Sequence, residues 1–167
     1  LSVFVMYSLI MAYSRSCIVV ICILISGCAS LFSGKPFPSP NTELRTPNLT
    51  AAYNKPYTIF GVTYHPLKSA RGYREIGYAS WYGTESGNRT SMGMRFVPDQ
   101  ITAAHKTLPL PSRVRVTNLQ NGLHVDVVVN DRGPFKKGRV IDLSRGAAKK
   151  IGLSGVTKVK IEHLGDK

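Results

Sequence analysis

Short runs of β-type residues, separated by Gly, Pro and Asn, fill the chain from Tyr57 onward. Residues 112–117 alternate polar and apolar side chains, and residues 123–129 form a second β-rich run. Between them, residues 118–122 contain the Asn-Gly pair that favours tight turns. Another alternating run covers residues 156–164. Many brief strands with tight turns are typical of a small β-barrel, so the pattern predicts a mainly β fold rather than a sheet of alternating strands and helices.

A single short helix is predicted between two of these runs. Ser144 is a suitable N-cap, and Gly152 is a typical residue after the last turn. Ala147 and Ile151 give the helix an apolar face. The barrel domain is assigned to residues 57–167, about 110 residues, which is enough for one hydrophobic core.

An apolar segment lies near the N-terminus, between Arg15 and Gly27. It is shorter than the roughly 20 residues that a membrane-spanning helix needs. Its order of positive, apolar and small residues is typical of a secretory signal. We therefore predict a signal peptide over residues 1–27, with Met11 as the true start. The alternative is one long spanning helix, which would bury the charge of Arg15 in the bilayer.

Residues 25–28 resemble the bacterial lipobox, in which the final cysteine is acylated before cleavage. The sequence therefore predicts a lipid anchor on Cys28, whose acyl chains would hold the protein in a membrane. No Asp follows this cysteine, and by resemblance to sorting rules its absence favours the outer membrane, facing the periplasm. Cys17 and Cys22 fall in the segment to be removed, so the mature chain is expected to form no internal disulfide.

A linker is predicted between the anchor and the barrel. Residues 28–56 begin with the acylated cysteine and are rich in Pro, Ser, Thr and Asn. This composition is typical of a disordered connection rather than a packed core.

The chain is strongly basic, because 22 Lys and Arg residues stand against 9 Asp and Glu, for a net charge of +13. A basic surface attracts polyanions. Nucleic acid is the usual partner of such a surface in the cytoplasm, whereas an exported chain meets lipid headgroups and the cell-wall polymer. We therefore expect peptidoglycan glycan strands and a lipid bilayer as partners, no nucleic acid, and a monomer.

Asp131 is a candidate for acid–base chemistry. It follows the second β-rich run and, if the pleat continues, shares the apolar face of Val125, Val127 and Val129. A carboxyl group there would be partly desolvated, which raises its pKa and suits it to donate a proton. The alternative is an Asp that caps the turn that follows it.

Other candidates have equally plain structural alternatives. His105 follows small and apolar residues, so it is either a semi-buried catalytic group or a structural histidine. Trp81 lies beside Tyr82, and its ring either stacks on a sugar or fills the core. Asp142 precedes the helix and is expected to brace it. The four histidines lack the spacing of metal ligands, so we expect no metal and no cofactor.

Several motifs in combination resemble the rare lipoprotein A family, and the resemblance covers about residues 55–164. The lead-in is similar at residues 55–59 and 64–66. The main motifs are Gly-Tyr-Ala-Ser-Trp-Tyr-Gly (77–83), Thr-Ala-Ala-His-Lys-Thr-Leu-Pro (102–109), Val-Arg-Val-Thr-Asn-Leu (114–119), Asn-Asp-Arg-Gly-Pro-Phe (130–135) and Ile-Asp-Leu-Ser (141–144).

The resemblance implies a double-psi β-barrel that acts as an endolytic peptidoglycan lytic transglycosylase. Such a lyase cleaves between N-acetylmuramic acid and N-acetylglucosamine without water, because the muramyl 6-hydroxyl attacks its own anomeric carbon and leaves a 1,6-anhydro end. The reaction needs an acid, a base and stabilisation of oxocarbenium-like charge. By position, Asp131 matches the family's catalytic aspartate and His105 its histidine. The candidate substrate-binding residues are Trp81, Tyr82, Lys106 and Arg132.

The chain departs from the family at one active-site position. Where Arg-Thr-Ala-Asn-Gly-Glu is usual, residues 89–94 read Arg-Thr-Ser-Met-Gly-Met, so Met94 replaces a frequent glutamate. This loss favours a second hypothesis, a non-catalytic lipoprotein that binds and loosens peptidoglycan. Many relatives also carry a glycan-binding module after the barrel, and we expect the anchor on Cys28 to take over part of its role in the cell envelope.

Overall fold

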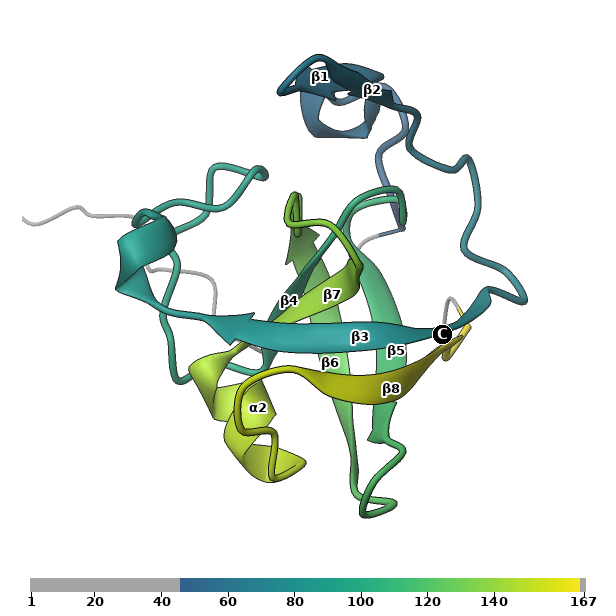
Figure 1. Cartoon of the computed structure of the whole chain (residues 1–167). Coiled ribbons are helices and arrows are strands. Elements are labelled where there is room, and N and C mark those ends of the chain that lie inside the picture. Colours follow the sequence, from purple (N-terminus) through teal and green to yellow (C-terminus); the bar gives the residue numbers. More distant parts are fainter. Residues whose placement is uncertain (1–45, 166–167) are drawn as a thin grey trace, which may run out of the picture. The chain divides into compact units, whose positions relative to one another are not determined.

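The computed structural model describes residues 46–165, which lie within one compact unit of the chain, Ser39–Lys167 (Figure 1). The predicted signal peptide over residues 1–27, Cys28 and most of the predicted linker lie outside the described residues. Within residues 46–165, no helix combines the length and the apolar character needed to cross a membrane.

Six strands close into a barrel (Figure 1). They are β3 (Arg74–Tyr82), β4 (Thr102–His105), β5 (Ser112–Asn118), β6 (His124–Asp131), β7 (Arg139–Ser144) and β8 (Thr157–His163). Their order around the barrel is β3, β7, β4, β6, β5, β8 and back to β3. The contacts of β3 with β7 and of β4 with β6 are parallel, and the others are antiparallel. The fold is the mainly β, double-psi barrel that the resemblance predicts.

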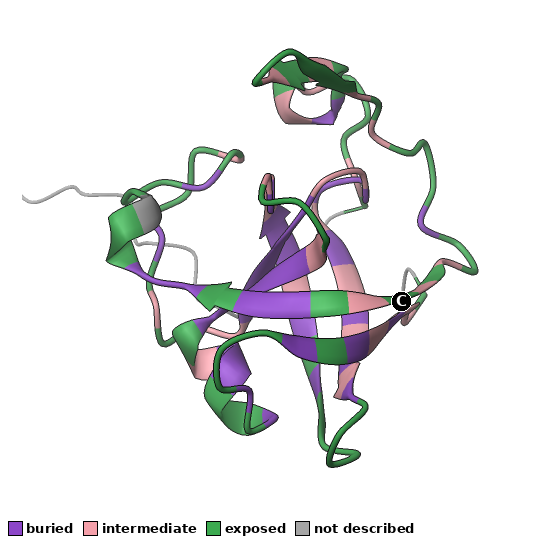
Figure 2. Cartoon of the chain, in the orientation of Figure 1, coloured by how far each residue is buried: buried purple, intermediate pink, exposed green. Residues whose placement is uncertain are grey.

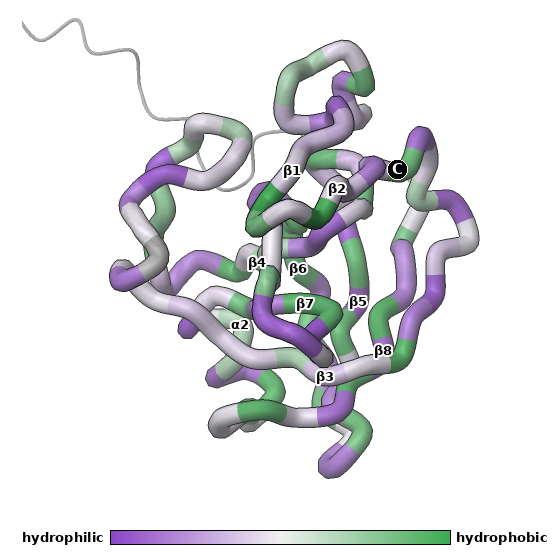
Figure 3. Tube along the Cα trace, turned by 45° about the horizontal axis from the view of Figure 1, so that its top comes forward, coloured by the Kyte–Doolittle hydropathy of each residue, from purple (hydrophilic) through white to green (hydrophobic). Residues whose placement is uncertain are grey.

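The core fills the inside of the barrel with aliphatic side chains. Along β5 every second residue is buried, as expected for a strand with one face inward. Figure 2 shows this burial on the barrel strands, and Figure 3 shows hydrophobic residues recurring along β5, β6 and β7. Burying each such side chain contributes about 1.5–3 kcal/mol. The largest wholly buried residues include Leu108, Leu110, Val114, Val116, Val129, Ile141, Leu143, Val159 and Ile161.

The locally encoded elements are confirmed. β5 and β6 form the predicted hairpin, with Thr117 opposite His124 next to the turn. The predicted helix is α2 (Arg145–Lys150), in which the Ser144 side chain accepts a hydrogen bond from the Ala147 N–H. Ile151 follows it and is wholly buried. Short-range signals, namely alternation, a turn pair and an N-cap, are therefore sufficient for these elements.

A small hairpin, β1 (Tyr57–Ile59) and β2 (Val62–Tyr64), lies beyond one end of the barrel (Figure 1). The rings of Tyr57 and Tyr64 stack with their centroids 5.3 Å apart, and the Tyr64 ring is 5.6 Å from that of Phe135. The Tyr57 hydroxyl also donates to the Lys106 carbonyl at 2.8 Å. These contacts attach the hairpin to the loops that follow β4 and β6.

Regular structure is present before residue 57, within the range that composition assigns to the linker. The short 3-10 helix η1 (Ala52–Asn54) carries Asn54, which is buried. The Asn54 amide donates to the Leu110 carbonyl, and its oxygen accepts from the Leu110 N–H, both at 2.8 Å. Composition does not reveal this contact because the partner lies 56 residues further along the chain.

The substitution Asn54→Ala tests this docking. It leaves the N–H and carbonyl of Leu110 without their partners, so we expect the free energy of unfolding to fall by about 2–4 kcal/mol in urea denaturation. The exposed Thr58→Ala is the control and should change stability by less than about 0.5 kcal/mol. Equal stabilities for the two variants would contradict the structural role of Asn54.

Candidate active site

Asp131 is the last residue of β6 and lies at a bulge. On the parallel neighbour β4, Ala103 pairs with Val129 and Ala104 with Asp131, so Asn130 is an extra residue. Asn130 is buried and Asp131 is only half-buried. The pleat therefore does not continue through Asp131, and the expectation that it shares the apolar face of the β6 valines is wrong.

Three donors converge on Asp131 Oδ1. They are the Ser91 N–H at 2.7 Å, the Ser91 hydroxyl at 2.5 Å and the Arg132 N–H at 2.7 Å. Ser91 lies in the loop between β3 and β4, in a turn closed by the Thr90 N–H and the Met94 carbonyl at 2.8 Å. The segment that lacks the family's glutamate thus supplies a serine to the carboxylate. Ser91 could have been identified as a site residue from the sequence, because it replaces the alanine that is usual at this position of the motif.

Asp142 on β7 is a second carboxylate, level with Asp131 across the sheet. It pairs with Ala104, which therefore has Asp131 on one neighbouring strand and Asp142 on the other. Paired residues on adjacent strands point to the same face, and two strand spacings separate their Cα atoms by about 10 Å. Burial raises the pKa of Asp142, against the opposing effects of Arg139, 3.1 Å away, and Lys106. The sequence assigned this residue only to bracing the helix.

His105 lies on the opposite face of β4 from Asp131. It follows Ala104 directly and pairs with the core residue Ile141, so its side chain points to the barrel interior and is 3% exposed. Its Nδ1 accepts hydrogen bonds from the N–H groups of Thr107 and Leu108, at 3.1 and 2.9 Å. Burial lowers the pKa of the imidazole. The two predicted catalytic residues therefore come from neighbouring strands but face different surroundings.

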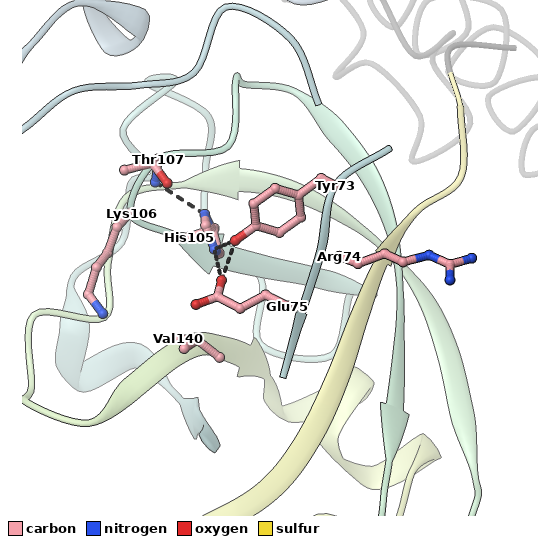
Figure 4. Close-up of a pocket in the computed structure, with 7 residues that line it drawn as sticks. All are labelled: Tyr73, Arg74, Glu75, His105, Lys106, Thr107 and Val140. Atoms are coloured by element: carbon pink, nitrogen blue, oxygen red, sulfur yellow. Dashed lines mark hydrogen bonds and ion pairs between the residues drawn. The ribbon is translucent and has the colours of Figure 1, made fainter. Parts of the chain in front are cut away.

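Glu75 and Tyr73 complete the surroundings of His105, and sequence reasoning missed both. Figure 4 shows the three side chains converging. Nε2 of His105 is 3.0 Å from the Tyr73 hydroxyl and 3.4 Å from Glu75 Oε2, and the Tyr73 hydroxyl donates to the same oxygen. The hydrogen bond from His105, then that from Tyr73, holds the pKa of Glu75 below its usual value despite partial burial. The pocket here measures about 320 Å³ and is lined by Tyr73, Arg74, Glu75, His105, Lys106, Thr107 and Val140.

The two aromatic candidates differ in exposure. Trp81 is 43% exposed, which leaves its ring open to stacking. Tyr82 is 7% exposed and stacks on Phe96 with the ring centroids 4.6 Å apart, and its assignment to substrate binding stays a prediction. Burial raises the pKa of the Tyr82 hydroxyl, and the charges of Asp131 and Asp142 add to this effect. The hydroxyl therefore lies near both carboxylates.

The Arg132 guanidinium makes hydrogen bonds within the fold, and its assignment as a substrate-binding group stays a prediction. Arg132 is half-buried. Its guanidinium donates hydrogen bonds to backbone carbonyls and one side-chain amide, at 2.6–3.3 Å. The acceptors are the carbonyls of Tyr53, His105, Lys106 and Leu108 and the side-chain oxygen of Asn54.

Lys106 lies between the pocket and Asp142. Its ammonium donates to the Arg139 carbonyl. Burial lowers the pKa of Lys106, against the opposing charges of Glu75 and Asp142. Within residues 46–165, no cluster of His, Cys, Asp and Glu side chains is arranged to hold a metal ion.

The chain is similar to known proteins over the barrel. The family model described as lytic transglycolase matches residues 74–163. Three proteins named "Endolytic peptidoglycan transglycosylase RlpA" are similar to the chain. That of Pseudomonas aeruginosa is 58% identical over 112 residues (65% of this chain, 33% of that protein), and that of Yersinia pestis 48% over 126 residues (75% and 34%). That of Vibrio cholerae is 41% identical over 160 residues (86% and 61%). The chain thus spans about a third of the length of the first two relatives.

Replacing Arg132 by lysine tests the structural role of the guanidinium. A single ammonium cannot serve acceptors spread along two segments, so Arg132→Lys should lower the free energy of unfolding by about 3 kcal/mol in urea denaturation. Arg115→Lys is the matched control, because Arg115 forms a partly exposed ion pair with Asp126, whose contribution is at most about 1 kcal/mol. Similar losses in both variants would show that Arg132 does not hold the fold.

The environment of His105 predicts that the stability of the folded chain depends on pH. Because its pKa in the folded chain lies below the ordinary 6.5, the unfolded chain takes up this proton first as the pH falls. The contribution of His105 to stability is therefore full above 6.5 and is lost as the pH falls through the lowered folded pKa. We expect ring ¹⁵N shifts of His105 to show a neutral, Nε2-protonated imidazole through pH 6.5, with stability decreasing below it. A His105 signal that titrates at or above 6.5 would refute this.

Proposed function

We propose, from the premise that the chain belongs to the lytic transglycolase family, that it is an endolytic peptidoglycan transglycosylase. Its substrate is then the bond between N-acetylmuramic acid and N-acetylglucosamine within glycan strands, and its product is a 1,6-anhydromuramyl end. Support comes from the family match over the barrel, the relatives of the same name and the chemistry of the site.

The observation that carries the proposal is the pair of carboxylates on either side of Ala104. Asp131 and Asp142 lie on the two strands that flank β4, on a common face. Their environments differ, since Asp142 is buried and has a raised pKa, whereas Asp131 is half-buried and accepts three hydrogen bonds on one oxygen. Carboxyl groups in contrasting environments are suited to separate acid and base roles.

The reaction assigns one proton transfer to each carboxyl group. Asp142 donates its proton to the leaving O4 of N-acetylglucosamine as the bond from O4 to the muramyl C1 breaks. The muramyl O6 forms the new bond to C1, and its proton passes to Asp131. Asp131 also stabilises the positive charge that develops at C1. No water is consumed, and proton exchange with solvent restores both groups.

We propose the remaining residues in supporting roles. Trp81 is exposed and suited to stack on a sugar ring. Lys106 lies near Asp142 and Glu75, and His105 acts within the neighbouring pocket. The lipidation of Cys28, a location in the cell envelope at the outer membrane facing the periplasm, and a monomeric state belong to the same proposal, and the N-terminal sequence and the net charge of +13 support them.

A second candidate function is that of a peptidoglycan-binding lipoprotein that does not cleave. Met94 favours it, because this residue is 43% exposed in the loop that approaches Asp131 and replaces a carboxylate of the family motif. Sacculus binding without released fragments would support this candidate over the enzyme.

Removal of either carboxyl group tests the enzyme. A soluble form that starts at Ala29 should release anhydro-ended fragments from purified sacculi, measured by mass spectrometry. Asp131→Asn and Asp142→Asn should each reduce the rate by about 10²–10⁴-fold, because an amide neither accepts nor donates the catalytic proton.

Asp126→Asn is the matched control for this experiment. Asp126 lies on β6, like Asp131, but forms a surface ion pair with Arg115, so its loss should leave the rate nearly unchanged. Products with ordinary reducing ends would contradict the proposed transglycosylase reaction. Full activity of Asp142→Asn would sink the proposed acid.

A further inference from the structure

The pocket beside His105 has a lining that includes neither Asp131 nor Asp142. It lies where the start of β3, the end of β4 and the start of β7 meet (Figure 4). Its volume of about 320 Å³ is at the lower end of the roughly 300–1,000 Å³ typical of small-ligand sites. Since His105 follows Ala104 directly, this pocket adjoins the carboxylate pair along one strand.

His105 has no free ring nitrogen to offer a ligand in this pocket. Its Nδ1 faces the N–H groups of Thr107 and Leu108, so the hydrogen-bond network places the ring proton on Nε2. A second proton on Nδ1 would point at two donors. Nε2 in turn faces Glu75 and Tyr73, at 3.4 and 3.0 Å. The imidazole is therefore a donor that acts on Glu75.

Glu75 is the member of this cluster that a ligand can reach. Its side chain is 37% exposed, against 3% for His105. Tyr73 and His105 both contact Oε2, and Figure 4 shows the other carboxylate oxygen pointing away from them. The pair of donors thus fixes one oxygen and leaves the carboxylate oriented toward the pocket.

The charges and walls of the pocket define the ligand chemistry. Lys106 lines it together with Glu75, whereas the Arg74 side chain points away and pairs with Glu162 (Figure 4). The neighbouring Lys106 cation opposes the binding of an ammonium group. A neutral hydrogen-bond donor is therefore the matching partner for the carboxylate. The Tyr73 ring and Val140 add apolar surface of the kind that packs against the C–H faces of sugar rings.

We infer that this pocket is a saccharide subsite, in which Glu75 accepts hydrogen bonds from the hydroxyl groups of a sugar residue. His105 and Tyr73 are positioning residues that hold its carboxylate. The identity of the sugar, a residue of the peptidoglycan glycan strand, rests on the proposed function, whereas binding itself does not require cleavage. The subsite also provides a carboxylate for glycan contact, that of Glu75, in a chain that has Met94 where the family motif usually has a glutamate.

The test measures binding in the full chain with Asp131→Asn as the common background, so that the ligand is not consumed. The probe is peptide-free glycan strands, prepared from purified sacculi by amidase digestion, and the dissociation constant is measured by calorimetry. Adding Glu75→Gln should weaken binding about tenfold, as expected for the loss of a charged hydrogen-bond acceptor. Glu162→Gln is the control, since Glu162 on β8 pairs with Arg74 and Lys160 at the surface, and should change the dissociation constant less than about twofold.

A pH series separates positioning from general structural support. The ionisable groups around Glu75 are His105, Tyr73, Lys106 and Arg74. Because the Tyr73 hydroxyl helps to lower the pKa of Glu75, Tyr73→Phe should move the acid-side loss of glycan binding to higher pH. A loss of affinity that is equal at every pH would instead mean that Tyr73 only supports the fold, and would overturn its positioning role.

The outcomes distinguish this inference from the proposed function. Unchanged affinity of Glu75→Gln, with native circular dichroism, overturns the subsite, and so does a parent chain that binds no glycan strand. Glu75-dependent binding without release of anhydro ends by the unsubstituted chain supports the subsite and overturns the transglycosylase. Release of anhydro ends together with binding that does not depend on Glu75 supports the transglycosylase and overturns the subsite.

Discussion

The Arg132 guanidinium holds together three parts of the chain that meet at one end of the barrel. Its five acceptors belong to the segment before β1, to the last residue of β4 and to the loop after β4, while its own backbone follows β6. Carbonyl groups at the ends of strands need partners once they leave water, and a planar guanidinium can serve several at once. The backbone N–H of the same residue binds the Asp131 carboxylate. One arginine therefore stabilises the strand ends and orients the principal candidate for catalysis.

The short strand β4 separates two chemical environments. Ala104 pairs with Asp131 on one neighbouring strand and with Asp142 on the other. The next residue, His105, faces the barrel interior. Because successive residues of a strand point to opposite faces, the carboxylate pair and the His105 pocket lie back to back. The buried imidazole is already satisfied by backbone donors and is a fixed element, whereas the half-buried Asp131 and the buried Asp142 on the other face are the groups to which we assign proton transfer.

The sequence was sufficient for features encoded by neighbouring residues. The hairpin of β5 and β6 and the capped helix α2 needed only alternation, a turn pair and Ser144. Motif resemblance identified the barrel and selected Asp131 and His105. The bulge at Asn130, by contrast, depends on pairing with β4, and the burial of Tyr82 depends on Phe96 from the next loop. Glu75 escaped notice because its partners, Tyr73 and His105, become a cluster only when β3 and β4 are brought together by the closed barrel.

The docking of Asn54 has a mechanical consequence. The chain enters the domain through a residue that is hydrogen-bonded to Leu110 and to the Arg132 guanidinium, and that guanidinium also grips the carbonyls of His105 and Lys106. A displacement of the chain at Asn54 would therefore be transmitted through Arg132 to the backbone beside the pocket. The entry point of the chain and the backbone beside the candidate site are therefore coupled through the hydrogen bonds of one guanidinium, that of Arg132.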